Sequence, residues 1–191
     1  MGLILNATTT NAGGGGGGGG GDMELIFSST LTSPTSSITT GTLPTGYKSL
    51  VIDTGLRCDG SYGSRVVLGY FNADTTKTNY QCTRFVMYTG APIYGALDYP
   101  YIAGTTGATA ASEFFGSDRI IIRDHEGTGN YKAWNTNETA MIGTAAGDRY
   151  YVGIAGLWKS TAAITSITFE VDDVAVPDFV AGSFVRVYGL K

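Results

Sequence analysis

Apolar and polar residues alternate with a period of two along most of the chain, the pattern of β-strands with one buried face. The clearest case is residues 164–172, where Ile167, Phe169 and Val171 alternate with polar neighbours. No stretch carries a sustained period of 3.6, and residues 139–146 have room for one helical turn at most. The pattern predicts strands at residues 23–31, 47–56, 64–71, 80–88, 120–124, 149–158, 164–172 and 183–189.

Polar segments rich in Gly, Asn, Asp and Pro separate these strands and are typical of turns. Residues 32–46 are predicted to form a loop, as is the Gly- and Pro-containing segment that carries Tyr94, Tyr99 and Tyr101. About eight to ten strands with such turns favour an all-β fold, an antiparallel two-sheet sandwich that is jelly-roll-like. We therefore predict a β-sandwich domain over residues 23–191.

An extended N-terminal arm, residues 1–22, precedes this domain and differs from it in composition. The arm contains Leu3, Ile4 and Leu5, and it ends in nine consecutive glycines, Gly13 to Gly21. Holding nine glycines in one conformation costs roughly 10–18 kcal/mol, which is comparable to the whole stability of a domain. An ordered glycine run therefore requires a neighbouring molecule that holds its backbone, and the alternative is a flexible linker.

A short apolar segment on a flexible tether is typical of an anchoring peptide that adds a strand to a neighbour's sheet. The first six residues have no basic flank and no long apolar core, so we expect no signal peptide and synthesis in a cytoplasm. We predict that the arm binds a partner, with Leu3, Ile4, Leu5, Gly13, Gly17 and Gly21 as candidate residues.

The composition indicates one domain with few surface charges. Charged residues make up 15% of the 191 residues, against a usual ~25%, and the net charge is −4. A low surface charge suits a protein that docks against copies of itself or other subunits. The 12 Lys and Arg residues are scattered, so we expect no binding to nucleic acid. The apolar runs are too short to span a membrane, so we expect no membrane partner.

The chain contains two cysteines, Cys58 and Cys82. They can form a disulfide if neighbouring strands carry them, but reduced and half-buried thiols are the favoured interpretation for a cytoplasmic product. Two cysteines without a Cys-x-x-Cys spacing do not predict a zinc site.

We find no residue pattern that predicts catalysis. The single histidine, His125, has Ser117 and Asp124 nearby in sequence, but the chain has no Gly-x-Ser-x-Gly motif. If the strand continued, Asp124 and Glu126 would share one face about 6–7 Å apart, a spacing within reach of glycosidase chemistry. A solvated strand end before a turn is the simpler interpretation, so we predict no catalytic residues.

Oxygen-bearing side chains cluster in two loops, at Asn72, Asp74 and Asn79 and at Asp172 and Asp173. Such side chains are ligands for Ca²⁺, but the spacing is not that of a calcium-binding loop, and the same residues commonly form turns. We therefore predict no bound metal and no cofactor.

Tyrosine is frequent, with 12 in the chain, and Tyr94, Tyr99 and Tyr101 lie close together in sequence. Tyrosine is favoured at interfaces, where one end of the side chain is apolar and the other is wet. These three residues are therefore the candidates for a glycan-binding site, with subunit contact and core packing as the alternatives.

Three segments, in the order in which they occur, suggest a family. Residues 42–52 read Thr-Leu-Pro-Thr-Gly-Tyr-Lys-Ser-Leu-Val-Ile, and residues 70–80 contain Tyr-Phe-Asn-Ala-Asp followed by Asn-Tyr. Residues 179–189 read Phe-Val-Ala-Gly-Ser-Phe-Val-Arg-Val-Tyr-Gly. Over residues 40–191 the chain resembles small β-sandwich structural proteins of tailed-phage virions. Ala73 departs from that pattern, because the position usually carries Gly.

The resemblance implies a non-enzymatic virion component that is assembled in the host cytoplasm and forms a homotrimer on the particle surface. A compact domain with a tethered arm suits a capsid cement or decoration protein that binds the major capsid protein or other virion subunits. Two alternatives stay open. One is a tail or fibre component that binds a host surface glycan, and the other is a hydrolase of envelope polysaccharide that uses Asp124 and Glu126.

Overall fold

The computed structural model describes residues 23–87, 92–141, 149–173 and 175–191. Twelve strands and one short 3-10 helix make up the regular structure of this part of the chain. The candidate arm residues lie outside the described residues: Leu3, Ile4, Leu5, Gly13, Gly17 and Gly21. The elements are β1 (Met23–Thr30), β2 (Ser37–Thr39), β3 (Ser49–Leu56), β4 (Ser64–Phe71), η1 (Lys77–Asn79), β5 (Tyr80–Met87), β6 (Ile93–Leu97), β7 (Tyr101–Thr106), β8 (Gly116–Arg123), β9 (Lys132–Met141), β10 (Arg149–Trp158), β11 (Ile167–Val171) and β12 (Phe184–Leu190).

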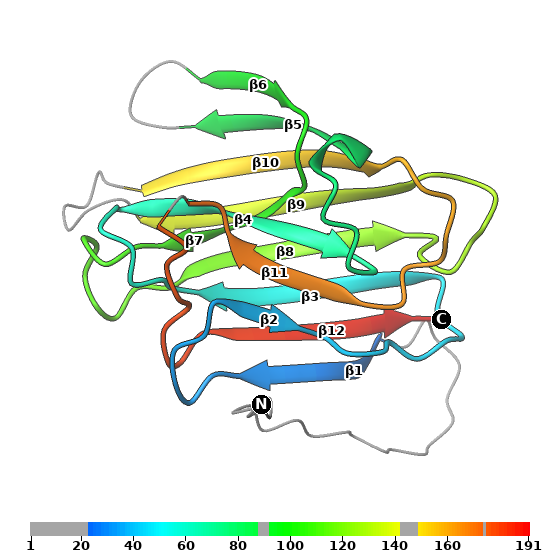
Figure 1. Cartoon of the computed structure of the whole chain (residues 1–191), viewed down its shortest axis with the longest axis horizontal. Helices are drawn as coiled ribbons and strands as arrows, with labels where there is room; N and C mark the ends of the chain where they lie inside the picture. The colour runs from blue at the N-terminus through cyan, green and yellow to red at the C-terminus, as the bar shows by residue number, and fades with distance from the viewer. Residues whose placement is uncertain (1–22, 88–91, 142–148, 174) are drawn as a thin grey trace.

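The strands form two sheets that face one another (Figure 1). The larger sheet has eight strands in the order β1-β12-β3-β8-β9-β10-β5-β6, and the smaller has four in the order β2-β11-β4-β7. Neighbouring strands in both sheets are antiparallel. The chain crosses repeatedly between the two sheets, which are unequal in size. The predicted two-sheet antiparallel sandwich is therefore confirmed.

The loop predictions are wrong at three strands. β2 lies within residues 32–46, and β6 and β7 replace the loop that was expected around Tyr94 and Tyr101. Every residue of β7 is buried, so its sequence carries no alternation from which a strand could be predicted. The helical turn proposed for residues 139–146 is wrong for residues 139–141, which belong to β9.

Four aromatic side chains join the two sheets in the core. Phe71, Tyr80, Trp134 and Trp158 come from β4, β5, β9 and β10, and their ring centroids lie 5.6–6.4 Å apart. Most of these contacts are edge-on or tilted, the geometry that aromatic quadrupoles favour. The Trp134 indole lies against Gly156, where a Cβ would have no room.

Polar side chains of the larger sheet bind the backbone of β7, the edge strand of the smaller sheet. Trp134 Nε1 donates to the Tyr101 carbonyl at 3.1 Å, and Thr136 Oγ1 donates to the Ile102 carbonyl at 2.7 Å. An edge strand presents a row of unpaired backbone groups, which must find partners when they are buried. The inward polar residues of β9 therefore take the place of a further strand beside β7.

The larger sheet extends beyond the smaller one at its β5–β6 end (Figure 1). No residue of β6 is buried, and the buried residues of β5 are Tyr80 and Cys82 at its start. β7 packs mainly over β8 and β9, so it leaves the inner face of β6 and of the second half of β5 open. The candidate site lies on this open side of the sandwich.

Candidate functional site

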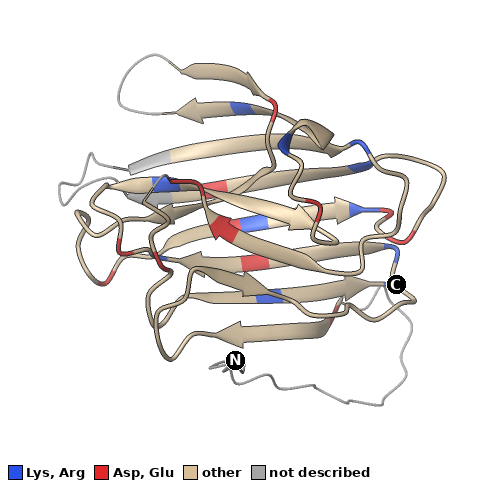
Figure 2. Cartoon of the chain, in the orientation of Figure 1, with Lys and Arg blue, Asp and Glu red and all other residues tan. Residues whose placement is uncertain are grey.

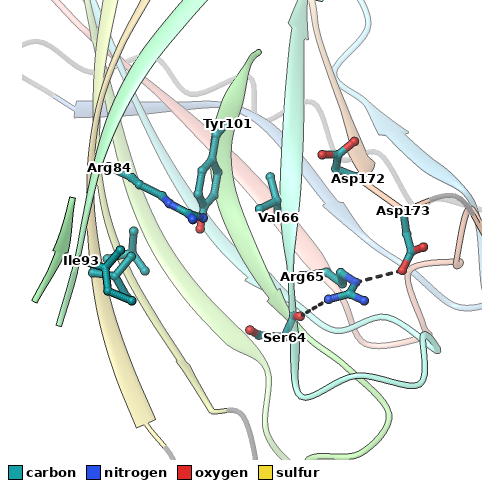
Figure 3. Close-up of a pocket in the computed structure, with 10 residues that line it drawn as sticks. Ser64, Arg65, Val66, Arg84, Ile93, Tyr101, Asp172 and Asp173 are labelled. Carbon is teal, nitrogen blue, oxygen red and sulfur yellow. Dashed lines mark hydrogen bonds and ion pairs between the residues drawn. The ribbon is translucent and has the colours of Figure 1, made fainter. Parts of the chain in front are cut away.

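A cleft of about 590 Å³ opens between the sheets where β5 and β6 extend past β7 (Figure 3). Its walls come from β4 and β7 on one side, from β5, β6 and β10 on the other, and from the segment that follows β11. Sites for small molecules typically enclose about 300–1,000 Å³, so the cleft is large enough for a ligand.

The larger sheet contributes an apolar wall to the cleft. Val86 of β5 is the direct cross-strand partner of Ile93 on β6 and of Val152 on β10, so these three side chains form a row across the sheet. Val66 of β4 lines the cleft from the opposite side. Ile93 is 53% exposed, so part of this apolar wall is in contact with solvent.

Three of the four charged side chains in the cleft are in ion pairs. Arg65 Nε donates to Asp173 Oδ2 at 2.9 Å, and the Arg65 guanidinium lies 3.0 Å from the centroid of the Tyr62 ring. Asp172 accepts a hydrogen bond from Lys77 Nζ at 3.0 Å. These contacts hold the segment after β11 against β4 and η1, and they neutralise the charges of Asp172 and Asp173.

The fourth charged side chain is Arg84, which extends from β5 into the cleft (Figure 3). Its Nε is buried without a hydrogen-bond partner, and no described residue forms an ion pair with it. Arg84 is the cross-strand partner of Gly95 on β6, and a Cβ on that glycine would come within 3.8 Å of Nε. Sequence analysis missed Arg84, although it shares the inward register of Tyr80 and Cys82.

The structure does not bring the three glycan candidates together. Tyr94 is 71% exposed and lies on the outer face of β6, where its ring centroid is 5.2 Å from that of Phe85. Tyr101 is 3% exposed and donates a hydrogen bond of 2.8 Å from its hydroxyl to Glu138 Oε2 in the core. Tyr99, which lies between them in the sequence, is partly buried against the core. A surface glycan site that includes Tyr101 is therefore incompatible with this burial.

The outer face of the β5–β6 end carries a patch of exposed apolar side chains. Phe85 lies opposite Tyr94 across β5 and β6, and Met87 lies opposite Tyr151 across β5 and β10. Met87, Tyr94 and Tyr151 are all exposed. We call Phe85, Met87, Tyr94 and Tyr151 the outer patch, and it lies on the opposite face of the sheet from the cleft.

Two buried carboxyl groups lie side by side beneath β7. Asp118 and Glu138 are cross-strand partners on β8 and β9. Asp118 accepts hydrogen bonds from Thr54 Oγ1 at 2.7 Å and from the Gly104 N–H at 3.1 Å. Burial raises the pKa of Asp118 to about 7, although these two hydrogen bonds oppose the shift. Sequence analysis missed the pair because the strand that carries Glu138 was not predicted.

The residues proposed as catalytic candidates do not assemble into a catalytic site. β8 ends at Arg123 and Asp124 has a φ of 50°, so Asp124 and Glu126 do not continue one strand face. Glu126 Oε1 accepts hydrogen bonds from the Gly46 and Tyr47 N–H groups. Glu126 is thus part of a turn contact, and the expected shared face for the two acids is wrong.

His125 is also placed differently from the prediction. It is 1% exposed rather than solvated, because its segment turns back into the sandwich where the Ile164 N–H donates to its carbonyl. Burial lowers the pKa of His125, and the nearby carboxylates of Glu126 and Asp124 oppose that shift. Ser117 lies near the far end of β8, about 20 Å along the strand from Arg123, so it cannot form a triad with His125.

The side chains proposed as calcium ligands stabilise turns. Asp74 Oδ2 accepts hydrogen bonds from Trp158 Nε1 at 2.8 Å and from Asn79 Nδ2 at 2.9 Å. Asn72 Oδ1 accepts a hydrogen bond from the Thr165 N–H at 2.7 Å. Among the described residues no group of three or more His, Cys, Asp and Glu side chains could hold a metal ion.

Both cysteines are free, so the structure has no disulfide between them, and both are fully buried rather than half-buried as predicted. Cys58 follows β3, and Cys82 lies on β5, away from it in the larger sheet. Burial raises the pKa of the Cys58 thiol, and it raises that of Cys82 to about 11.

No family model, curated protein or solved structure matches the chain. In the described ranges no helix is long and apolar enough to cross a membrane. Inference about function therefore depends on the two surfaces at the β5–β6 end, the cleft and the outer patch.

Proposed function

We propose that this chain is a structural subunit of a tailed-phage virion, a capsid cement or decoration protein that docks on the particle through its N-terminal arm and stabilises the shell. The observation that carries the proposal is the outer patch, with its exposed Met87, Tyr94 and Tyr151 at the projecting end of the larger sheet. Exposed apolar patches of this kind mark interaction surfaces.

The edge strand beside this patch has none of the usual protection against pairing. β6 reads Ile-Tyr-Gly-Ala-Leu and, like β2 and β7, carries no charge, whereas Figure 2 shows charged residues on several of the longer strands and on the loops. Exposed edge strands usually carry charges, prolines or bulges. We infer that a second copy of the chain covers this edge in a homotrimer. An uncharged apolar surface can associate with its own copy because no complementary charge is needed.

The resemblance to virion proteins adds to this proposal. Residues 42–52 lead into β3 and residues 179–189 lead into β12, and these two strands pair. The Tyr47 ring packs directly on Gly189, where a side chain has no room. Two of the three similar segments thus depend on each other structurally, which gives a physical reason for their joint occurrence.

The trimer is tested by placing a charge in the outer patch. Tyr94→Arg introduces a charge at a side chain that is 71% exposed, so the fold is retained while the apolar contact is lost. Tyr131→Arg, at an exposed loop tyrosine outside the patch, is the matched control. Sedimentation should show a trimer for the wild type and for the control and a monomer for Tyr94→Arg. A wild-type monomer at micromolar concentration contradicts the proposed trimer.

The location on the particle is tested separately. A cement protein should be present in hundreds of copies on the shell, which quantitative mass spectrometry and electron cryomicroscopy of virions would measure. Deletion of residues 1–21 should abolish binding to stripped particles and leave a folded domain. Undiminished binding by the truncated chain, or a few copies confined to the tail, contradicts the capsid assignment.

A tail component that binds a host glycan is the second candidate, and the exposed ring of Tyr94 beside Phe85 favours it. Aromatic faces of this kind can stack on sugars. Tyr94→Ala should then lower adsorption of the virion and binding on a glycan array, while Tyr131→Ala leaves both unchanged. Equal adsorption by both variants removes this candidate.

A further inference from the structure

We propose that the cleft is a binding site for a carboxylate carried on a short aliphatic stem, and that Arg84 binds the carboxylate. The proposal does not rest on the virion function. The cleft lies on the inner face of β5 and β6, whereas the outer patch lies on their other face.

The charged side chains of the cleft and their ion-pair partners leave one positive charge unpaired. Arg65 is paired with Asp173, and Asp172 is paired with Lys77. Arg84 extends into the cleft with no ion-pair partner among the described residues. One positive charge therefore stays uncompensated, and a single anion would neutralise it.

The surroundings of the Arg84 guanidinium make an unpaired state unfavourable. Its Nε is buried and has no acceptor in the described part of the chain. A buried donor without an acceptor loses its hydration and gains nothing in return. A carboxylate offers two coplanar oxygens to the donor fork of arginine, which is the strongest common hydrogen-bonded pair of side-chain groups.

The walls of the cleft define what the carboxylate is attached to. Val66, Val86 and Val152 line it, together with the half-exposed Ile93, so an aliphatic stem can bury its surface beside Arg84. Gly95 contributes no side chain across from Arg84, and the stem of Arg84 lies over it. A carboxylate matches the single uncompensated charge of Arg84, whereas a doubly charged phosphate would bring a second negative charge that no free cation of the cleft neutralises.

Titration of the full chain with hexanoate tests the proposal, with chemical shifts of the β5 and β6 amides as the readout. We expect saturable binding with a Kd on the order of 1–10 mM, and no saturable shifts with hexanamide, which has the same stem without the charge. Arg84→Met should weaken hexanoate binding by about tenfold or more. Arg123→Met, at an exposed arginine outside the cleft, should leave it unchanged.

Arg84→Lys provides a second variant if the Met variant fails to fold, because it keeps the charge and the apolar stem. It should bind hexanoate more weakly than the wild type, because lysine cannot form the two parallel hydrogen bonds. Equal binding of hexanoate and hexanamide, equal hexanoate binding by the Arg84 variants and the wild type, or no saturable shift below about 50 mM hexanoate overturns the proposal.

The carboxylate can come from a free organic acid or from the end of another polypeptide. N-acetyl-Ala-Ala-Leu with a free carboxyl terminus represents the second source, and its amidated form lacks the charge. Tighter binding of hexanoate than of the free peptide indicates that the ligand is a free organic acid. Tighter binding of the free peptide indicates that it is the carboxyl terminus of a polypeptide. Binding of the amidated peptide as tightly as the free peptide contradicts recognition of a carboxylate.

Discussion

Asp118 lies directly opposite Glu138 across β8 and β9, and both side chains are buried, at 3% and 0% exposure. Two carboxyl groups that face each other in a protein interior do not both ionise at neutral pH without a large cost. The proton they retain connects the stability of the sandwich to pH.

We predict that stability falls as the pH rises from about 5 to 8. Burial raises the pKa of Asp118 to about 7, above its ordinary value of 3.8. The native state therefore binds a proton that the unfolded chain has released. The contribution of Asp118 is fully present below about pH 4 and is lost as the pH rises through about 7. Urea unfolding should show a loss of about 1–3 kcal/mol between pH 5 and pH 8.

Asp118→Asn should flatten this profile, because the amide does not titrate while it keeps the shape of the side chain. Glu113→Gln is the control. The pKa of Glu113 is lowered by hydrogen bonds from its own backbone N–H and from Ser112, so it titrates below the window. His125, whose pKa is lowered by burial, makes stability rise with pH in part of the same window, so the comparison of the two profiles is decisive. Equal slopes for the wild type and Asp118→Asn between pH 5 and pH 8 would contradict a buried proton at Asp118.

We predict that Ala73→Gly stabilises the protein by about 0.5–1 kcal/mol. Asn72 and Ala73 have φ values of 53° and 58°, and the Asp74 N–H donates to the Phe71 carbonyl at 2.9 Å. This is a type I′ turn, in which alanine is strained and glycine is not. The midpoint of chemical unfolding measures the gain.

The neighbouring substitution Asn72→Gly is the matched control for the turn. It also relieves a positive φ, but it removes the side-chain oxygen that accepts hydrogen bonds from the Thr165 and Ser166 N–H groups. We expect a net loss of about 1–2 kcal/mol. If Ala73→Gly also destabilises the chain, the turn geometry described here is wrong.

Thr136→Val should destabilise the chain by about 1–2 kcal/mol, although the two side chains have nearly the same volume. The buried Thr136 hydroxyl donates to the Ile102 carbonyl at 2.7 Å, and valine leaves that carbonyl without this donor. Thr139→Val, at an exposed position of the same strand, should change stability by less than about 0.5 kcal/mol. Equal effects of the two substitutions would exclude a role for Thr136 in holding the edge of β7.

Cys58 and Cys82 should resist labelling by thiol reagents in the folded protein. Both are buried, and burial raises the pKa of Cys82 to about 11, so the reactive thiolate is rare at pH 8. Both should react on unfolding in urea. Thr83→Cys places a thiol at the exposed neighbouring position and should react within minutes without denaturant. Rapid labelling of the folded wild type would show that this part of the core opens.

The strands that were predicted correctly are those in which burial follows the alternation of apolar residues. In β11, Ile167, Phe169 and Val171 are buried and the residues between them are not. β9 has the same alternation of burial, but its inward residues include Lys132, Thr136 and Glu138. A pattern of apolar residues cannot reveal a strand whose buried side chains are polar.

The cleft could not be predicted from the sequence either. Arg84 lies on a predicted strand and its side chain points to the inner face of the sheet. From the sequence alone, such an arginine can pair with a nearby acidic side chain as readily as with a ligand. The decisive facts are that β7 stops short of β5, and that Asp172 and Asp173 have other partners. Both facts depend on contacts between residues distant in sequence.

The sequence by itself determined that this protein is an antiparallel β-sandwich. In a strand that is covered on one face, apolar residues occur at every second position, so the pattern is visible without the structure. The tertiary structure alone decided which polar side chains are buried, where the smaller sheet ends and which charge is left without a partner. Hydrogen bonds and ion pairs depend on distance in space, and that distance is set only when the two sheets pack.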